Sequence, residues 1–198
     1  MTATRLYHLP KSRSTRVLWA LEELGAPYEL VVMAPEDRRS DEHRTRHPLG
    51  RVPVIEDDAG HLFESAAIVL ALADRHDGLN FPLGSREREL VYQWVLFAVT
   101  EVERWIADAR DGESDPERAA QAAERIASAG TVVDEALRGH EFIVGDRFSA
   151  ADIILSAALA WAGSFGLLDH HPEVDRWLDA LDERPARAIA NAPAPATA

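Results

Sequence analysis

Apolar residues change their spacing near the middle of the chain. Up to about residue 77, short runs rich in β-formers, such as Tyr28 to Met33, alternate with helical patterns such as Ser14 to Leu24, which Gly25 closes. Beyond residue 87 the strand signals almost stop. Helical periodicity then continues in residues 87–110, 117–137, 150–165 and 172–181. The pattern predicts an α+β protein whose mixed first domain precedes an all-α domain.

The first half contains enough elements for one small sheet. Strands are expected at residues 5–9, 28–33, 52–56 and 61–63, and helices at 14–24 and 66–73. A helical crossover makes the first two strands parallel, whereas the turn "DDAG" makes the last two an antiparallel hairpin. We therefore predict a four-stranded mixed sheet covered by helices, with an irregular stretch before the third strand.

Turn-forming residues mark the domain boundaries. The segment "GLNFPLGSR" at 78–86 clusters glycine, proline, asparagine and serine between two helical patterns, which indicates a linker. The first domain is thus expected at residues 1–77 and the helical domain at 87–191. Residues 192–198, which consist of alanine, proline and threonine, are expected to form a disordered tail.

Composition limits the ligands and cellular surroundings that the protein is expected to have. The 198 residues include 34 acidic and 21 basic ones, a net charge of −13 without a basic stripe, which argues against a nucleic-acid surface. The absence of cysteine excludes disulfides, CxxC redox centres and thiolate zinc sites, and the eight histidines lack ligand spacing, so no metal is expected. The N-terminus resembles no leader and no apolar run suits a membrane helix, which predicts a cytoplasmic protein. Lys11 is the single lysine among arginines, which suggests a GC-rich bacterial genome.

The segment "GRVPVIEDDAGHLFESAAI", residues 50–68, holds two unusual features. Pro53 interrupts a strand pattern. A cis Val52–Pro53 bond would turn the Val52 backbone toward an extended peptide, and a trans edge-strand proline is the alternative. We predict the cis form. Glu64 and Ser65 precede an apolar helix, where a hydroxyl and free N–H groups make a carboxylate site, and a plain N-cap is the alternative.

Two other serine-led helices are informative. Ser149 and Asp152, in "GDRFSAADI", have the spacing of a capping box, which is a folding device. Ser12 and Ser14, in "YHLPKSRSTRVLWALEELG", lie where a strand ends and a helix begins. Their hydroxyls and the helix N-terminus favour an anion, although such serines are also frequent caps. Nucleotide phosphate is not indicated, because no glycine-rich phosphate loop occurs.

Three segments resemble the cytosolic glutathione transferases, in family order and spacing. They are "SRSTRVLWALEELG", "HPLGRVPVIEDDAGHLFESAAIVLALAD" and "FIVGDRFSAADI". The linker and the helical second half match as well, so the resemblance covers nearly the whole chain. It implies a thioredoxin-like first domain that binds glutathione as cosubstrate, followed by a helical-bundle domain, and a cytoplasmic homodimer.

The resemblance also implies roles for individual residues. Val52 is similar to the residue whose backbone pairs with the cysteinyl part of glutathione, and Pro53 to the family's cis-proline. Glu64 and Ser65 resemble the pair that holds the γ-glutamyl end. Arg51 lies where a polar side chain of the family reaches the ligand. Ser12 resembles the serine that activates the thiol in the serine-type classes, and Ser14 and Tyr7 are the alternatives for that role.

The implied chemistry is thiolate attack on a small hydrophobic electrophile. The electrophile is expected against a stripe formed by Trp94, Phe97, Ala98 and Trp105, which core packing would also explain. Glu101 on that face resembles an acidic residue that crosses the dimer interface to the ligand's ammonium, with solvent exposure as the alternative. Isomerisation, peroxide reduction or dehalogenation, with glutathione or another thiol, is an alternative reaction. A non-catalytic ligand-binding or protein-interaction module is the alternative function.

Overall fold

The computed structural model describes residues 4–193, and their contacts divide the chain into two units. The first contains the residues up to Asn80 together with those from Glu183 onward. The second is Phe81–Asp182.

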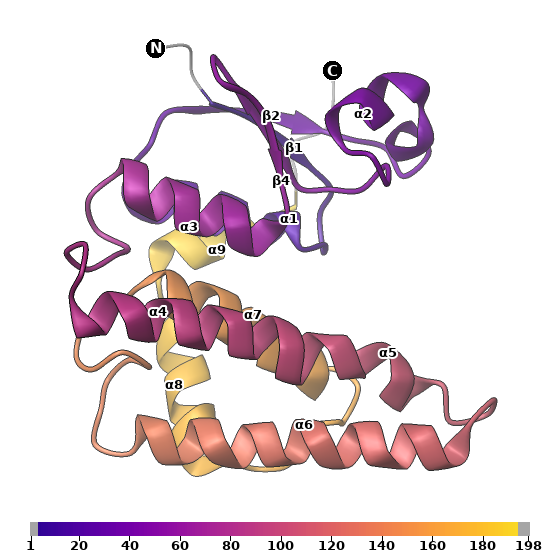
Figure 1. Cartoon of the computed structure of the whole chain (residues 1–198), viewed down its shortest axis with the longest axis vertical. Helices are drawn as coiled ribbons and strands as arrows, with labels where there is room; N and C mark the ends of the chain where they lie inside the picture. The colour runs from indigo at the N-terminus through magenta and orange to yellow at the C-terminus, as the bar shows by residue number, and fades with distance from the viewer. Residues whose placement is uncertain (1–3, 194–198) are drawn as a thin grey trace. The chain divides into compact units, whose positions relative to one another are not determined.

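The first unit is built on a four-stranded mixed sheet in the order β2-β1-β3-β4 (Figure 1). Strands β1 and β2 are parallel, whereas β3 is antiparallel to both β1 and β4, as predicted. The third strand begins two residues later than expected, because Pro53 has no N–H to donate to a ladder. The strands are β1 (Thr4–His8), β2 (Tyr28–Val32), β3 (Val54–Asp57) and β4 (Gly60–Phe63).

Helices cover both faces of this sheet. Helices α1 (Ser14–Leu24) and α3 (Ser65–Arg75) lie on one side and α2 (Asp41–Arg46) on the other (Figure 1). The buried faces of α1 and α3 form the core of this unit with the sheet. Fully or almost fully buried members of that core are Leu6, Val17, Leu21, Ile55, Ile68 and Leu72.

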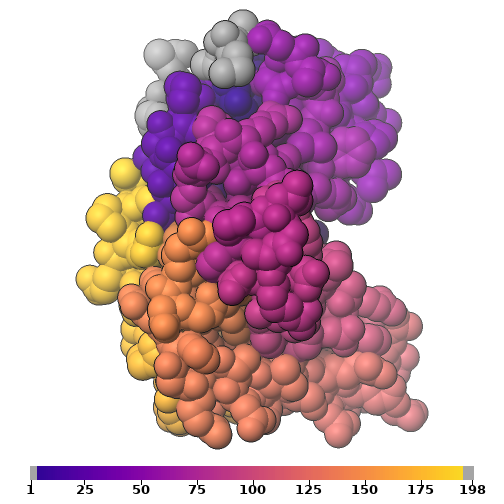
Figure 2. Space-filling view, turned by 60° about the vertical axis from the view of Figure 1, so that its left-hand side comes forward, coloured from indigo at the N-terminus to yellow at the C-terminus, as the bar shows by residue number. Residues whose placement is uncertain are grey.

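Two parts of this unit depart from the sequence pattern. Helix α2 and the 3-10 turn η1 (Asp37–Arg39) occupy the stretch expected to be irregular, because only His43 of these residues is buried and no apolar repeat marks them. Helix α9 (Pro185–Asn191) packs on α1, although residues 87–191 were expected to form one helical domain. In the space-filling view, C-terminal residues in yellow lie at the surface beside indigo N-terminal residues (Figure 2).

The second unit is helical along most of its length. Helix α4 (Arg86–Phe97) continues through a π-helical segment, η2 (Ala98–Glu103), into α5 (Arg104–Arg110). The remaining helices are α6 (Pro116–Leu137), α7 (Ala150–Gly163) and α8 (Pro172–Asp182). The predicted capping box begins α7, where the Ser149 N–H donates to Asp152 Oδ2 at 2.9 Å. This motif is structural, as expected.

Two expectations from the sequence concern the C-terminal tail and membrane-spanning helices. Residues 194–198 of the predicted disordered tail lie outside the described residues. Between residues 4 and 193, no helix combines the length and apolar character that crossing a membrane requires.

Candidate active site

The sheet brings three of the predicted site segments to one of its ends. Tyr7 pairs with Val54 across β1 and β3, and Val54 pairs with Phe63 across β3 and β4. The segments that continue past this row, at residues 9–14, 51–53 and 64–65, therefore leave the sheet at the same end. Neighbouring strands lie about 4.8 Å apart, so these segments span roughly 10 Å, which suits an extended tripeptide.

The Val52–Pro53 peptide bond is cis, as predicted. Val52 precedes β3 and has no partner in the ladder between β1 and β3, while Pro53 is buried. The Val52 backbone thus lies at the edge of the site with its ladder position unused. An extended peptide could pair with it there.

Helix α3 begins at this edge with an unusual first turn. Glu64 takes the N-cap position in the left-handed region, with φ at 72°, and its side chain makes no capping hydrogen bond. Ser65 is the first helical residue and is 6% exposed. Because the first helical bond runs from Ile68 N–H to Glu64 O, the N–H groups of residues 65–67 have no partner in the helix. This arrangement suits an anionic group.

The loop before Val52 is held by a residue that the sequence did not single out. The Nε2 atom of His43, which is 1% exposed, lies 2.8 Å from the Arg51 carbonyl oxygen, while the Arg51 side chain is exposed. Gly50 has a φ of 58°, and a Cβ there would lie 2.5 Å from the Arg38 carbonyl oxygen. Helix α2 and this glycine therefore fix the position of Arg51 and Val52.

Ser12 lies in a compact hydrogen-bonded cluster between β1 and α1. Its Oγ lies 2.7 Å from the Leu9 carbonyl oxygen and 2.7 Å from Ser14 Oγ, and it accepts the Ser14 N–H at 3.2 Å. Ser14 Oγ accepts the Leu9 N–H at 3.0 Å and lies 2.8 Å from His8 Nδ1. Ser12 is partly exposed, whereas Ser14 is fully buried and His8 is 2% exposed. Of the two serines, Ser12 is thus the one that a ligand can reach.

Burial also sets the charge of His8. It lowers the pKa of the imidazole below 6.5, and a hydrogen bond with the Ser14 backbone opposes this only partly. His8 is therefore neutral at pH 7.

Tyr7 directs its hydroxyl away from this cluster. The hydroxyl donates to Glu56 Oε2 at 2.6 Å, and the Arg46 guanidinium lies 4.6 Å from the centre of the ring. Burial, and then the bond to Glu56, raise the pKa of Tyr7, while that bond lowers the pKa of Glu56. Because successive side chains of a strand face opposite sides, Tyr7 lies on the α2 face and His8 on the α1 face.

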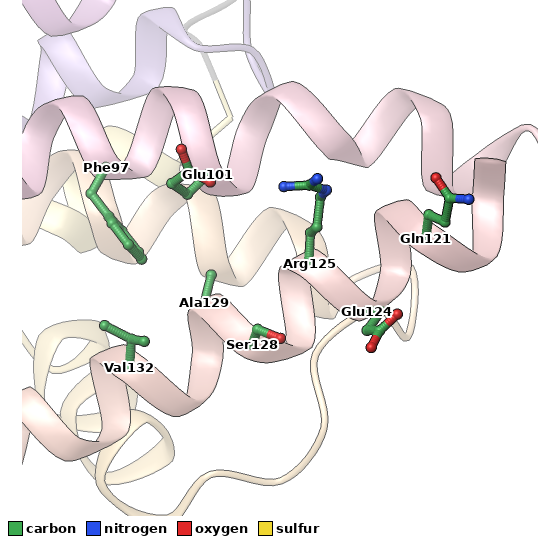
Figure 3. A pocket seen from close by; sticks show the side chains of 8 residues that line it. All are labelled: Phe97, Glu101, Gln121, Glu124, Arg125, Ser128, Ala129 and Val132. Atoms are coloured by element: carbon green, nitrogen blue, oxygen red, sulfur yellow. The ribbon is translucent and has the colours of Figure 1, made fainter.

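The residues expected to contact the electrophile lie in different environments in the second unit. Trp94 and Ala98 are buried. Trp105 instead contacts two arginines, because the guanidinium carbons of Arg104 and Arg125 lie 4.4 and 4.6 Å from the centre of its ring. Phe97 lines a different feature, a pocket of about 520 Å³ formed with α6. Figure 3 shows Phe97 pointing toward Ala129 and Val132 of α6.

Glu101 is exposed and lines the same pocket, with Glu124, Arg125 and Ser128 (Figure 3). Across residues 4–193, no group of three or more histidine or acidic side chains has the geometry of a metal site.

Two family models match consecutive parts of the chain. The model described as "Glutathione S-transferase, N-terminal domain" matches residues 6–80, and "Glutathione S-transferase, C-terminal domain" matches residues 75–185. A thioredoxin-like domain followed by a helical domain, with these matches, defines the class. The chain belongs to the glutathione S-transferase family.

Known relatives carry two kinds of name. Glutathione S-transferase 3 of Schizosaccharomyces pombe is 28% identical over 93% of this chain and 85% of its own length. Elongation factor 1-gamma of Trypanosoma cruzi is 31% identical over 72% of this chain and 35% of its own length. Among solved structures, a glutathione transferase family member from Pseudomonas fluorescens pf-5, with two glutathione bound, is 27% identical with a TM-score of 0.85, covering 96% of this chain and 92% of that one.

Proposed function

We propose that this protein is a glutathione transferase of the serine type, which binds glutathione at the shared end of β1, β3 and β4 and activates its thiol through Ser12. The observation that carries the proposal is the register of Tyr7, Val54 and Phe63, which gathers three separate segments beside one another. Membership of the family and the glutathione-bound relative support the choice of ligand.

Each segment has a partner on the tripeptide. The backbone N–H and C=O of Val52 pair with the cysteinyl residue. The γ-glutamyl carboxylate lies at the N-terminus of α3 and accepts from the Ser65 hydroxyl, while Glu64 accepts from the ammonium group. Arg51, whose side chain is exposed beside this edge, supplies a positive charge for the ligand's remaining carboxylate.

The chemistry requires a thiolate. A free thiol has a pKa of about 8.5, so only a few per cent is ionised at neutral pH, and lowering that pKa by two units takes about 2.7 kcal/mol of differential stabilisation. The Ser12 hydroxyl and the N-terminus of α1 supply part of this. The thiolate attacks a small hydrophobic electrophile, the new sulfur–carbon bond forms, and the leaving group departs with its bonding electrons.

Ser12 suits this role better than the other candidate hydroxyls. Ser14 is fully buried, and the Tyr7 hydroxyl is bonded to Glu56 on the α2 face. Ser12 is partly exposed at the end of β1, where the ligand's sulfur would lie.

Replacing Ser65 tests the proposed ligand. Ser65→Ala should weaken glutathione binding by about 1.5–3 kcal/mol, the range for a hydrogen bond to a charged group. Calorimetric titration of the purified chain with glutathione measures this. Ser85→Ala is the matched control, because Ser85 Oγ accepts the Arg88 N–H at 3.2 Å as an ordinary N-cap. It should lower the free energy of unfolding by about 1 kcal/mol and leave the affinity unchanged. An unchanged affinity in Ser65→Ala would contradict the site.

A non-catalytic binding or assembly module is the second candidate. Relatives named elongation factor 1-gamma, rather than transferase, favour it. The two functions differ in one measurement: a transferase lowers the thiol pKa of bound glutathione and turns over a generic aryl halide, whereas a module does neither.

The proposal includes a homodimer. Apolar side chains are exposed in both units, as large dimer interfaces require. In the second unit Leu96, Val99 and Val132 are 62%, 38% and 49% exposed, and Val132 lines the pocket of Figure 3. In the first unit Leu49 and Phe63 are 65% and 37% exposed. The first unit of one subunit would meet the second unit of its partner, with Glu101 near the interface.

A cytoplasmic location is part of this proposal, because glutathione keeps thiols reduced in that compartment. A bacterial source is proposed from the nearly lysine-free composition, in which Lys11 stands alone among the arginines.

A further inference from the structure

His8 and Ser14 lie behind Ser12, where a ligand cannot touch them. His8 is 2% exposed and Ser14 is fully buried. The contacts nevertheless run without interruption from His8 Nδ1 to Ser14 Oγ at 2.8 Å and from Ser14 Oγ to Ser12 Oγ at 2.7 Å. Any effect of these two residues on a bound thiol must therefore pass through the Ser12 hydroxyl.

The number of available protons limits which atoms can donate and which can accept in the hydrogen bonds of this cluster. The Leu9 carbonyl oxygen lies 2.7 Å from Ser12 Oγ and 3.0 Å from Ser14 Oγ, so four contacts in the cluster each need a hydroxyl or imidazole proton. The two serine hydroxyls supply one proton each. The backbone N–H groups of Leu9 and Ser14 already donate to Ser14 and Ser12 and cannot replace them.

The two neutral forms of His8 have different consequences. If Nδ1 carries no proton, it accepts a hydrogen bond from the Ser14 hydroxyl. The Ser12 hydroxyl then donates to the Leu9 carbonyl or to Ser14 Oγ. If Nδ1 carries the proton, it donates to Ser14 Oγ. The Ser14 hydroxyl then donates to Ser12 Oγ or to the Leu9 carbonyl. The Ser12 hydroxyl can turn outward, and in doing so it gives up its own bond to the Leu9 carbonyl.

We propose that His8 is a positioning residue, which as the Nδ1–H tautomer donates to Ser14 so that Ser14 donates to Ser12 and Ser12 donates to the ligand's sulfur. This inference rests on the proposed function of Ser12. It requires a neutral imidazole, which the lowered pKa of His8 provides at pH 7. Hydrogen bonds that run in one direction also polarise one another, so each strengthens the next.

The tautomer can be read in the free protein, without any ligand. Long-range proton–nitrogen correlation spectra of the isotopically labelled full chain distinguish Nδ1–H from Nε2–H histidine, and the loss of one signal in His8→Asn assigns it. The Nδ1–H form is expected. An Nε2–H form would overturn the inference, whether or not the protein binds glutathione.

Variants then test the consequence for the thiol. His8→Asn keeps an N–H donor near the position of Nδ1, whereas His8→Leu removes it. His8→Leu should raise the thiol pKa of bound glutathione by about 0.5 unit, a threefold loss of thiolate, while His8→Asn stays close to the wild type. In a Ser12→Ala background, His8→Leu should add nothing. Ser14→Ala breaks the same path and serves if His8→Leu does not fold.

The outcomes distinguish a failure of the proposed function from a failure of the proposed role of His8. If the wild type does not bind glutathione, the proposed function and the donation from Ser12 to sulfur fail together, and the tautomer still decides whether His8 donates to Ser14. If Ser12→Ala shifts the thiol pKa but His8→Leu does not, or if His8→Asn behaves as His8→Leu does, the role of His8 is refuted and the proposed function stands.

Discussion

Asp152 joins three segments of the helical unit through one buried carboxylate. Its Oδ2 accepts the N–H and the hydroxyl of Ser149, each at 2.9 Å, and its Oδ1 accepts the Ile143 N–H at 3.0 Å and the Trp177 Nε1–H at 3.1 Å. Burial raises the pKa of Asp152 to about 6, and these four bonds oppose the shift. The carboxylate is therefore ionised at pH 7.5.

Replacing Asp152 by asparagine leaves one oxygen for these donors. In the better orientation the oxygen keeps Ile143 and Trp177, the Ser149 hydroxyl rotates to accept from the new amide, and the Ser149 N–H loses its partner. One buried unsatisfied donor costs about 1–3 kcal/mol, so Asp152→Asn should lower the free energy of unfolding by about 2 kcal/mol. Asp152→Ala removes every acceptor and should cost about 4 kcal/mol or more.

Urea unfolding at pH 7.5, followed by circular dichroism, measures both changes. Asp146→Asn is the matched control, because the Asp146 side chain lies in the loop that precedes α7 and is 81% exposed. It should change the free energy of unfolding by less than about 0.5 kcal/mol. If Asp152→Asn were as stable as this control, the reasoning about the four donors would be wrong.

Two further predictions concern assembly and pH. Val132→Glu places a charge at an exposed apolar position of α6 and should convert the dimer to a monomer in light scattering. Ile189→Glu, at a site of similar exposure on α9, should leave the dimer intact, and a dimeric Val132→Glu would argue against the interface. Burial lowers the pKa of His8 and of His47, so each binds fewer protons in the folded than in the unfolded chain, and stability from these groups is lost as pH falls below about 6.5. Comparison with His8→Asn isolates the contribution of His8 from that of His47 and from that of Asp152, whose raised pKa acts in the opposite direction. Equal pH dependence of the two proteins would count against the contribution of His8.

The elements with strong periodicity could be predicted from the sequence. Helix α1 spans residues 14–24 as expected, because its apolar stripe is regular and Gly25 closes it with a φ of 56°. Helices α2 and α9 were missed because they are short. Arg184, directly before α9, donates from Nε and Nη2 to the Glu23 carboxylate at 2.6 and 2.7 Å, and the Arg187 guanidinium carbon lies 5.0 Å from the centre of the Trp19 ring. Contacts with residues 161 or more positions away leave no local signal in the sequence.

Some residues of the candidate site could be predicted from the sequence, and others could not. Ser12, Pro53 and Ser65 stand beside strand ends and helix starts, where a polar residue or proline conflicts with the local pattern and draws attention. His8 and His43 were not singled out, because one histidine ends a strand and the other lies in a charged helix, and neither position is unusual in sequence. Their importance comes from contacts with Ser14 and with Arg51 that only the folded chain brings about.

The thiol pKa of bound glutathione tests the central claim most directly. It is measured by ultraviolet absorbance of the thiolate against pH for the wild type and for Ser12→Ala, with calorimetry to confirm that both bind the tripeptide. The wild type should titrate below the value of about 8.5 for a free thiol, and Ser12→Ala should titrate about one to two units higher than the wild type at nearly the same affinity. A wild type in which glutathione titrates as it does in free solution, or a Ser12→Ala variant whose titration is unchanged, would contradict the account.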